Sequence, residues 1–315
     1  MTYEQVLNSV ALKKRFCKDA NVPITVFDEP YFSQRLELLD DYYGCVEKFV
    51  LFAKELEHYP DEQSYFEFYN SVKDSIINMI KENEYYNIFN NVDVGAIAPI
   101  GNFPNRSLYI DENDDKHFIS IDMKKANFSA LRHFNSQIFK NAETWEQYIG
   151  MFTNFQHIIH SKYIRQVIMG ACNPKKQIQY ERYLTSHLAF LISEKMPDIK
   201  IYSVSNDEII IENVGDVSLT ELKDVLDCDI GALFRMEVFC LSKLGDYGWA
   251  KYFAFEPTQI KCVDGDILPQ ILRYMNGQTP TDSDLVFRYN HMLAKFLEPI
   301  KNPVKYPFGG EYNGD

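Results

Sequence analysis

A change of hydrophobic period constrains the fold more than any other feature of this sequence. In HFISIDMKKANFSALRHF, residues 117–134, apolar and polar residues alternate up to Asp122, and apolar residues then recur at helical spacing from Ala126. A period of two is typical of a strand, and a period of about 3.6 is typical of a helix. The segment therefore predicts a strand that ends at Asp122 and a helix that leaves it.

A second segment, IKIYSVSNDEIIIE at residues 199–212, has two short apolar runs around a polar turn. This pattern predicts a β-hairpin whose returning strand starts at Asp207. Two strand-end carboxylates can hold Mg²⁺ or Mn²⁺ for phosphoryl transfer, because Mg²⁺ needs only one or two carboxylates plus substrate phosphates. We expect Asp122 and Asp207 to be the metal ligands. Glu208 is a further catalytic candidate, although a strand should turn it to the opposite face from Asp207.

The order of the predicted elements indicates a ferredoxin-like sheet. After the first strand come helices, the hairpin, a helix that a capping-box sequence opens at Ser218, and strands in FRMEVFCLSKL and WAKYFAF. This is a β-α-β-β-α-β order, so we expect an α+β fold with antiparallel strands and packed helices. The expected parts are a helical N-terminal subdomain and linker over 1–106, a palm-like catalytic domain over 107–262 with a helical insertion at 124–196, and C-terminal helices and a tail over 263–315.

Hydrophobic patterns also predict elements before residue 117 and after residue 262. Up to about residue 90, apolar residues recur at helical spacing, with a stop at Pro60. SLYI at 107–110 and the strand at 117–122 flank a polar turn, which predicts another hairpin. We expect two closing helices over 266–275 and 280–298, since the second has Pro at its first position.

The charge distribution limits the classes of partner. A net charge of −13 argues against a protein that coats duplex nucleic acid through bulk electrostatics. Cationic residues are nevertheless concentrated in one part of the chain, which allows a local basic channel. Those residues are Lys124, Lys125, Arg132, Lys162, Arg165, Lys175, Lys176 and Arg182.

Three features bear on the compartment. The six Cys residues are scattered without a CxxC pair, which is typical of reduced thiols. No apolar run approaches the roughly 20 residues of a membrane helix. The first residues lack the apolar region and cleavage site of a signal peptide. These features predict a cytoplasmic protein without a membrane partner, and a virus- or phage-encoded protein would fit as well.

Two motifs resemble those of right-hand polymerases. FISIDMKKANFSALR is similar to motif A, and SVSNDEIIIE is similar to motif C, especially that of family A DNA polymerases, with Asn206 in place of their His. The separation of Asp122 and Asp207, 207 − 122 = 85 residues, is closer to that of reverse transcriptases. The resemblance covers roughly residues 107–245. It implies a polymerase palm that uses two metal ions.

The resemblance also implies residues that bind the triphosphate. Motif B of family A enzymes is a helix that carries Arg and Lys toward the incoming nucleotide. The nearest candidates are Arg165, Lys175 and Lys176, with solvated helix faces as the alternative. Motif D would contain Lys243 as a proton donor to pyrophosphate, with an ordinary surface lysine as the alternative.

A further implication concerns the sugar of the nucleotide. Asn127 lies five residues after Asp122, where motif A approaches the sugar. A bulky residue there would block a 2′-hydroxyl, whereas the short amide of Asn can form a hydrogen bond with it. Asn127 is therefore compatible with ribonucleotides, and Phe128 could act as the barrier if the register shifts by one.

The sequence thus predicts a nucleotidyltransferase, a template-dependent DNA or RNA polymerase with a two-metal mechanism. Its expected partners are a nucleic-acid primer-template, nucleoside triphosphates and an accessory protein. Two alternatives stay open. One is a palm-derived nucleic-acid-binding accessory protein without catalysis, and the other is a metal-dependent nuclease that uses Asp122, Asp207 and Glu208. Two ordinary surface acids at strand ends would also explain the pattern.

Overall fold

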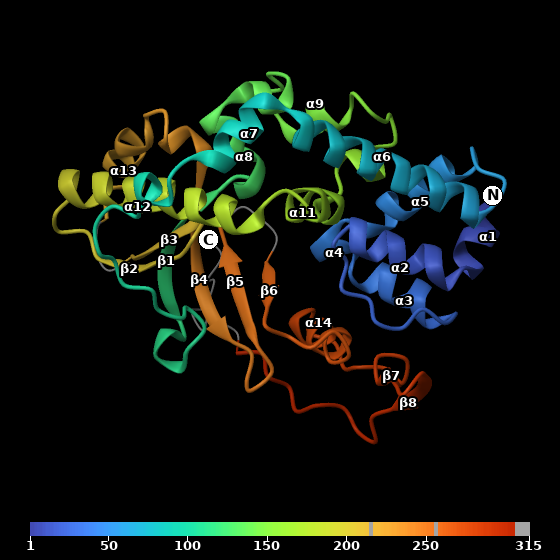
Figure 1. Ribbon diagram of the computed structural model, residues 1–315. Coiled ribbons are helices and arrows are strands. Elements are labelled where there is room, and N and C mark those ends of the chain that lie inside the picture. The colour runs from blue at the N-terminus through green and yellow to red at the C-terminus, as the bar shows by residue number, and fades with distance from the viewer. Residues whose placement is uncertain (214–216, 255–257, 306–315) are drawn as a thin grey trace.

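A six-stranded antiparallel sheet lies at the centre of the fold (Figure 1). The structure is a computed structural model and describes residues 1–213, 217–254 and 258–305. The strands follow the order β2-β3-β1-β4-β5-β6, and neighbouring strands run antiparallel. Their bounds are Lys116–Met123 for β1, Ile201–Val204 for β2, Glu208–Glu212 for β3, Phe234–Lys243 for β4, Trp249–Phe253 for β5 and Gln259–Lys261 for β6.

The strand order confirms the predicted α+β fold with a ferredoxin-like sheet. In such a unit the third strand lies between the second and the first, and the fourth lies on the other side of the first. The order β2-β3-β1-β4 is this arrangement, which β5 and β6 extend at one edge. The helices after β1 are α8 Ala126–Phe134, α9 Trp145–Ile149, α10 Gln156–Ile159, α11 Lys162–Gly170 and α12 Pro174–Lys195, and α13 Leu219–Leu226 follows β3.

Alternation along β1 separates the two faces of the sheet. Ile119 and Ile121 are fully buried in the main core that the helices cover. Phe118 points to the other face and stacks on Phe239 with ring centroids 5.9 Å apart. Ser120 and Asp122 share that second face, because every other strand residue points the same way. This face therefore changes from apolar to polar toward the end of β1.

The predicted helical N-terminal region is confirmed. The helical pattern before Pro60 is interrupted at Gly44, which has a left-handed backbone with φ 54°. The helices are α1 Tyr3–Asn8, α2 Val10–Asp19, α3 Tyr31–Leu38, α4 Asp40–Tyr43, α5 Cys45–Leu56, α6 Glu62–Glu82 and α7 Glu84–Asn91. Across the described part of the chain, none of the helices combines the length and apolar character needed to cross a bilayer.

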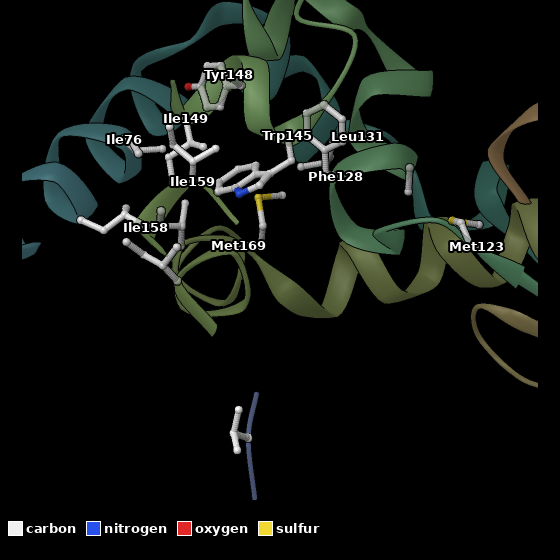
Figure 2. Packing of buried hydrophobic residues seen from close by; sticks show 14 of the residues in the cluster. Ile76, Met123, Phe128, Leu131, Trp145, Tyr148, Ile149, Ile158, Ile159 and Met169 are labelled. Carbon is white, nitrogen blue, oxygen red and sulfur yellow. The ribbon is translucent and has the colours of Figure 1, made fainter. Parts of the chain in front are cut away.

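The N-terminal helices and the inserted helices share one core (Figure 2). Trp145 of α9 lies in it with only 1% of its surface exposed. Phe128 of α8 packs edge-on against Trp145 and lies 4.6 Å from the ring of Phe139. Ile76 of α6 and Met169 of α11 belong to the same cluster. The core therefore continues across residue 106, where the sequence suggested a subdomain boundary.

Residues 107–110 do not form the predicted strand. They bend and lead into the 3₁₀ helix η2, Asp111–Asn113. The buried amide of Asn113 explains the difference, because it donates to the carbonyl of Leu108 at 2.8 Å and to the hydroxyl of Tyr202 at 2.9 Å. These side-chain bonds satisfy the segment without a strand partner.

The second predicted closing helix, over 280–298, is also wrong. The helix α14, Leu268–Met275, is present, but it is followed by a hairpin of β7, Val286–Tyr289, and β8, Met292–Lys295. The two turn residues, Asn290 and His291, both have left-handed backbones, with φ 47° and 68°. Two consecutive residues of this kind match a tight hairpin turn and end any helix.

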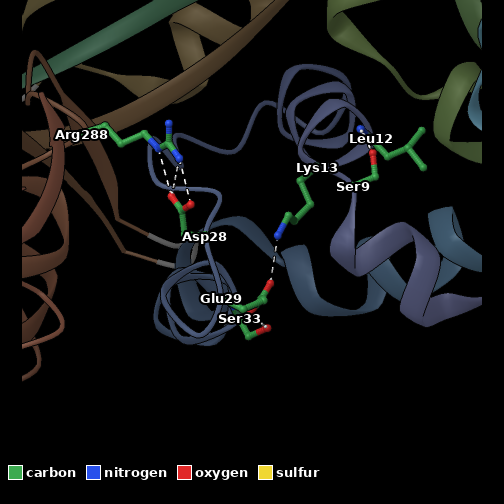
Figure 3. A network of polar contacts seen from close by, with 7 residues as sticks. All are labelled: Ser9, Leu12, Lys13, Asp28, Glu29, Ser33 and Arg288. Carbon is green, nitrogen blue, oxygen red and sulfur yellow. Dashed lines mark hydrogen bonds and ion pairs between the residues drawn. The ribbon is translucent and has the colours of Figure 1, made fainter. Parts of the chain in front are cut away.

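The C-terminal hairpin packs back on the N-terminal helices (Figure 3). The guanidinium of Arg288 on β7 makes a bidentate pair with Asp28, with Nη2 2.7 Å from Oδ2 and 2.8 Å from Oδ1. The neighbouring Glu29 accepts from the buried Lys13 of α2 at 3.1 Å. The first and last parts of the chain therefore support each other beside the sheet.

Candidate active site

The end of β1 and the turn between β2 and β3 meet at one edge of the sheet. Asp122 is opposite Glu208 in the register of β1 and β3. The next residue, Met123, donates its N–H to the carbonyl of Asp207 at 2.8 Å. This bond fixes Asp207 beside the strand end, and both Asp122 and Asp207 line a cavity of about 760 Å³. The structure thus brings the two predicted acids to one cavity.

The two aspartates interact electrostatically. Burial, followed by the negative charge of Asp122, raises the pKa of Asp207 above its ordinary value. Hydrogen bonds from Ser205 and from its own backbone, together with the charge of Lys162, oppose that rise. Both carboxylates therefore belong to the same cavity, and each adds negative charge to the surroundings of the other.

An arginine that the sequence did not indicate is bound to Asp122. Arg235 is the register partner of Asp122 on β4, and its Nη2 lies 3.0 Å from Oδ2 of the carboxylate. Arg235 also contacts Glu237 at 3.2 Å, and 53% of its side chain is exposed. An exposed pair of this kind contributes little to stability, so a divalent cation could compete with it.

A third carboxylate comes from α12. Glu181 is buried, with 7% of its surface exposed, and lines the cavity with Asp207. Burial and then the charge of Asp207 raise the pKa of Glu181 to about 7. The sequence did not single it out, because a lone Glu within a helix usually belongs to a solvated face. The available signal is the polar series Gln177, Glu181 and Thr185, whose four-residue spacing keeps these buried residues on one side of the helix.

Helix α11 presents cationic and polar groups to the cavity. Lys162, Arg165 and Gln166 have the i, i+3 and i+4 spacing of one helix face, and all three line the cavity. The Nε of Arg165 is buried and has no hydrogen-bond partner among the described residues. Burial lowers the pKa of Arg165, while the charge of Glu146 opposes this. Arg165 is therefore the predicted triphosphate residue that the fold brings to the aspartates.

The link from β1 to α8 supplies further cations to the lining. Lys125 has a left-handed backbone with φ 48°, and its amine bonds Glu146. Lys124 donates to the carbonyl of Ala232 at 3.0 Å, and Arg132 also lines the cavity. The cavity lining thus has more cationic than acidic side chains, in a chain that is acidic as a whole.

Two of the predicted triphosphate lysines do not reach the cavity. Lys176 is buried, and its amine donates to the carbonyls of Asn90 at 2.6 Å and Val92 at 2.5 Å. It therefore binds the end of α7 and not a phosphate. Lys175 is exposed at the start of α12 and is not part of the cavity lining.

Lys243 lies far from the cavity, whereas Glu208 lies beside Asp122 but outside the cavity lining. Lys243 lies at the far end of β4, eight residues from Arg235, which is roughly 26 Å along a strand. It pairs there with Asp111 at 2.9 Å, so it cannot serve a reaction at Asp122. Glu208, the register partner of Asp122 on β3, accepts from Ser120 and is not part of the cavity lining.

Asn127 and Phe128 differ in their access to the cavity. Both belong to its lining, and Asn127 is half-buried, with its side-chain oxygen accepting from the N–H of Phe128 at 2.9 Å. Phe128 is only 3% exposed and is held in the aromatic core by Phe139 and Trp145. Asn127 is thus the side chain that can meet a ligand, and Phe128 mainly supports it from behind.

The donor set suits a hard cation such as Mg²⁺, with further ligands from a substrate. Within the described residues, no group of three or more His, Cys, Asp and Glu side chains is close enough to hold a metal ion. Asp122 and Asp207 would provide two carboxylates, and Mg²⁺ sites in phosphoryl transfer commonly use one or two carboxylates together with phosphates and water. The residues therefore fit a metal that arrives with a phosphate ligand.

No protein-family model matches this sequence, and a search of curated proteins finds no relative. The resemblance of the two motifs to polymerase palms therefore stays a prediction that the chemistry of the cavity has to support.

Proposed function

We propose that the protein is a template-dependent nucleotidyltransferase, a DNA or RNA polymerase of the palm type. One observation carries the proposal: Asp122 and Asp207 line one cationic cavity, at the strand end and hairpin turn of a ferredoxin-like sheet. Paired carboxylates with surrounding cations suit phosphoryl transfer, in which charge develops on phosphate oxygens and must be neutralised.

Different residues of the cavity would bind the metal and the triphosphate. Asp122 and Asp207 would hold Mg²⁺ or Mn²⁺, which when bound would stabilise the attacking and leaving oxygens of an in-line displacement. Arg165 would bind the triphosphate of the incoming nucleotide, because a guanidinium can make two parallel hydrogen bonds to phosphate and its Nε has no hydrogen-bond partner in the described part of the chain. Lys162 would add a second charge one helical turn away.

The remaining groups would orient the nucleotide. Asn127 would approach the sugar, since its half-buried amide lines the cavity and adds little bulk. Glu181 lines the same cavity as Asp207, and once it ionises, above about pH 7, its negative charge would add to the attraction for cations. These assignments replace the predicted roles of Lys175, Lys176 and Lys243.

The test is primer extension with dNTPs or NTPs in the presence of Mg²⁺ or Mn²⁺. Asp122→Asn and Asp207→Asn should each abolish incorporation, and the double variant should be no worse, because the two acids act as one unit. Asp198→Asn, at an exposed position outside the cavity, is the control. Near-wild-type incorporation by either cavity variant would remove that residue from the metal site.

A second candidate is nucleic-acid binding without catalysis. The ion pair between Arg235 and Asp122 favours it, because one of the two metal-binding acids already has a cationic partner. Calorimetric titration with Mn²⁺ separates the two functions. A polymerase should bind Mn²⁺ and lose that binding in Asp207→Asn, whereas a non-catalytic protein should show no Mn²⁺ binding that depends on Asp207.

A further inference from the structure

A second cavity, of about 660 Å³, lies between the N-terminal helices and the edge of the sheet. Its lining includes Lys18 of α2 and Tyr43 of α4. It also includes Tyr163 of α11 and Lys261 of the edge strand β6. Four separate elements therefore converge on this cavity, and only α11 among them also lines the first cavity.

The lining differs in chemistry from the rest of the chain. It contains Lys18 and Lys261 and the three phenol rings of Tyr42, Tyr43 and Tyr163, while no Asp or Glu is present among its described residues. The whole chain has 45 acidic residues and 32 Lys and Arg, so the charge of this lining is opposite in sign to the net charge of the chain. Cations with aromatic rings suit a polyanion that also has flat rings.

Cationic side chains lie close to the ring of Tyr163. The guanidinium of Arg15 lies 4.6 Å from the centre of its ring, and the amine of Lys18 lies 5.6 Å from it. The hydroxyl of Tyr42, also in the lining, donates to Asn276 at 2.8 Å, which orients that ring. Tyr42 and Tyr163 are therefore in contact with neighbouring elements before any ligand arrives.

Helix α11 connects the two cavities. Gln166 belongs to the lining of both. Lys162 and Arg165 face the first cavity, whereas Tyr163 faces the second. A chain-like ligand that occupies the second cavity can therefore cross α11 at Gln166 and enter the cavity that contains Asp122.

We propose that the second cavity binds single-stranded nucleic acid, and that the strand continues over α11 into the first cavity. Proteins that bind single strands combine a cationic groove with aromatic side chains on which bases stack. A duplex would hide the base faces that Tyr42, Tyr43 and Tyr163 could contact. That the bound strand serves as a template rests on the proposed polymerase function, whereas its binding does not.

Binding is measured by fluorescence anisotropy with fluorescein-labelled oligothymidylate and oligouridylate, in EDTA so that no metal takes part. Tyr163→Leu removes the ring and should weaken binding by roughly 5- to 150-fold, the range for loss of one stacked base. Tyr163→Phe keeps the ring and should bind like the wild type. Unlabelled oligothymidylate should displace the probe more effectively than an equal concentration of duplex.

Charge variants at Lys18 and Lys261 test the inference even if Tyr163→Leu does not fold. Lys18 is exposed, so Lys18→Glu should fold normally, weaken binding and reduce the salt dependence of log K by about 0.7 for each lost phosphate contact. Lys261→Glu on β6 should act in the same way. Lys223→Glu on α13, exposed and outside both cavities, is the matched control and should leave the affinity unchanged.

The outcomes separate this inference from the proposed function. Wild-type affinity in Lys18→Glu, Lys261→Glu and Tyr163→Leu would overturn the inference, even if Asp122→Asn abolishes nucleotide incorporation. Equal losses in these variants and in Lys223→Glu would overturn it too, because the effect would then be one of net charge. Selective losses without any nucleotide incorporation would support the strand-binding cavity and refute the polymerase.

Discussion

Replacing the buried Glu181 with Gln should stabilise the protein at alkaline pH and have little effect in acid. Glu181 is 7% exposed beside Asp207, and burial followed by the charge of Asp207 raises its pKa from an ordinary 4.5 to about 7. Between these two pH values the folded protein binds a proton at Glu181 that the unfolded chain has released. Stability must therefore fall as the pH rises through this window.

The size of the effect follows from the raised pKa. The difference between 4.5 and about 7 corresponds to about 3 kcal/mol, at about 1.4 kcal/mol for each pH unit. The wild type loses this free energy once Glu181 ionises in the folded state, whereas Gln carries no charge at any pH. For a chain of 315 residues, with an unfolding entropy of about 2.1 cal/mol/K per residue, 3 kcal/mol is equivalent to about 4–5 °C in Tm.

The assay is thermal unfolding of Glu181→Gln and the wild type in EDTA, from about pH 5 to about pH 8. The difference in Tm should be small at the acid end and should grow to about 4–5 °C at the alkaline end. Glu143→Gln is the matched control, because Glu143 lines the same cavity but is exposed. Its stability should stay within about 0.5 kcal/mol of the wild type throughout.

Two results would refute this reasoning. If the Tm curves of Glu181→Gln and the wild type ran parallel across the whole range, Glu181 would not titrate differently in the folded and unfolded states. If Glu181→Gln were less stable than the wild type at the alkaline end, a cation in the cavity would have to stabilise the ionised Glu181. That stabilisation would then exceed the cost of burying the charge beside Asp207.

Three further predictions follow from the same region. Lys176→Met should cost about 2 kcal/mol in urea unfolding, since two partly buried carbonyls lose a charged donor, whereas Lys175→Met should cost less than about 0.5 kcal/mol; equal costs would contradict this. Arg235→Gln should tighten Mn²⁺ binding by a factor of about 2–5 in calorimetry by freeing Asp122, and weaker binding would mean that Arg235 orients the carboxylate. Asn127→Tyr should lower the ratio of kcat/KM for an NTP over its dNTP, because a larger side chain would meet the 2′-hydroxyl; an unchanged ratio would place Asn127 away from the sugar.

Local sequence determined much of the sheet. The change of period at Asp122 predicted both β1 and α8, because alternation and helical spacing are each set by backbone geometry. The polar turn before Asp207 predicted the β2–β3 hairpin in the same way. The order of these elements then predicted the ferredoxin-like strand order, since few arrangements bury one face of such a sheet.

Local sequence failed where distant contacts or turn conformations decided the structure. The segment 107–110 has an apolar pattern, but the side chain of Asn113 bonds it in a bent conformation. The pattern over 280–298 suits a helix, but the left-handed backbones of Asn290 and His291 reverse the chain, and Arg288 holds the hairpin against Asp28. Arg288 and Asp28 lie far apart in the sequence. Hydrophobic periodicity predicts neither left-handed backbone conformations nor side-chain hydrogen bonds.

The candidate site shows the same division. The sequence by itself was enough to predict that Asp122 and Asp207 meet at one edge of the sheet. Both lie at strand ends, and the strand order makes β1 and β3 neighbours. Only the tertiary structure decided that Glu181 stands beside Asp207 and that Lys176 binds the end of α7. Helical spacing says which residues share a face but not what that face meets, and the pKa and the ion pairs of a side chain depend on the groups that folding brings next to it.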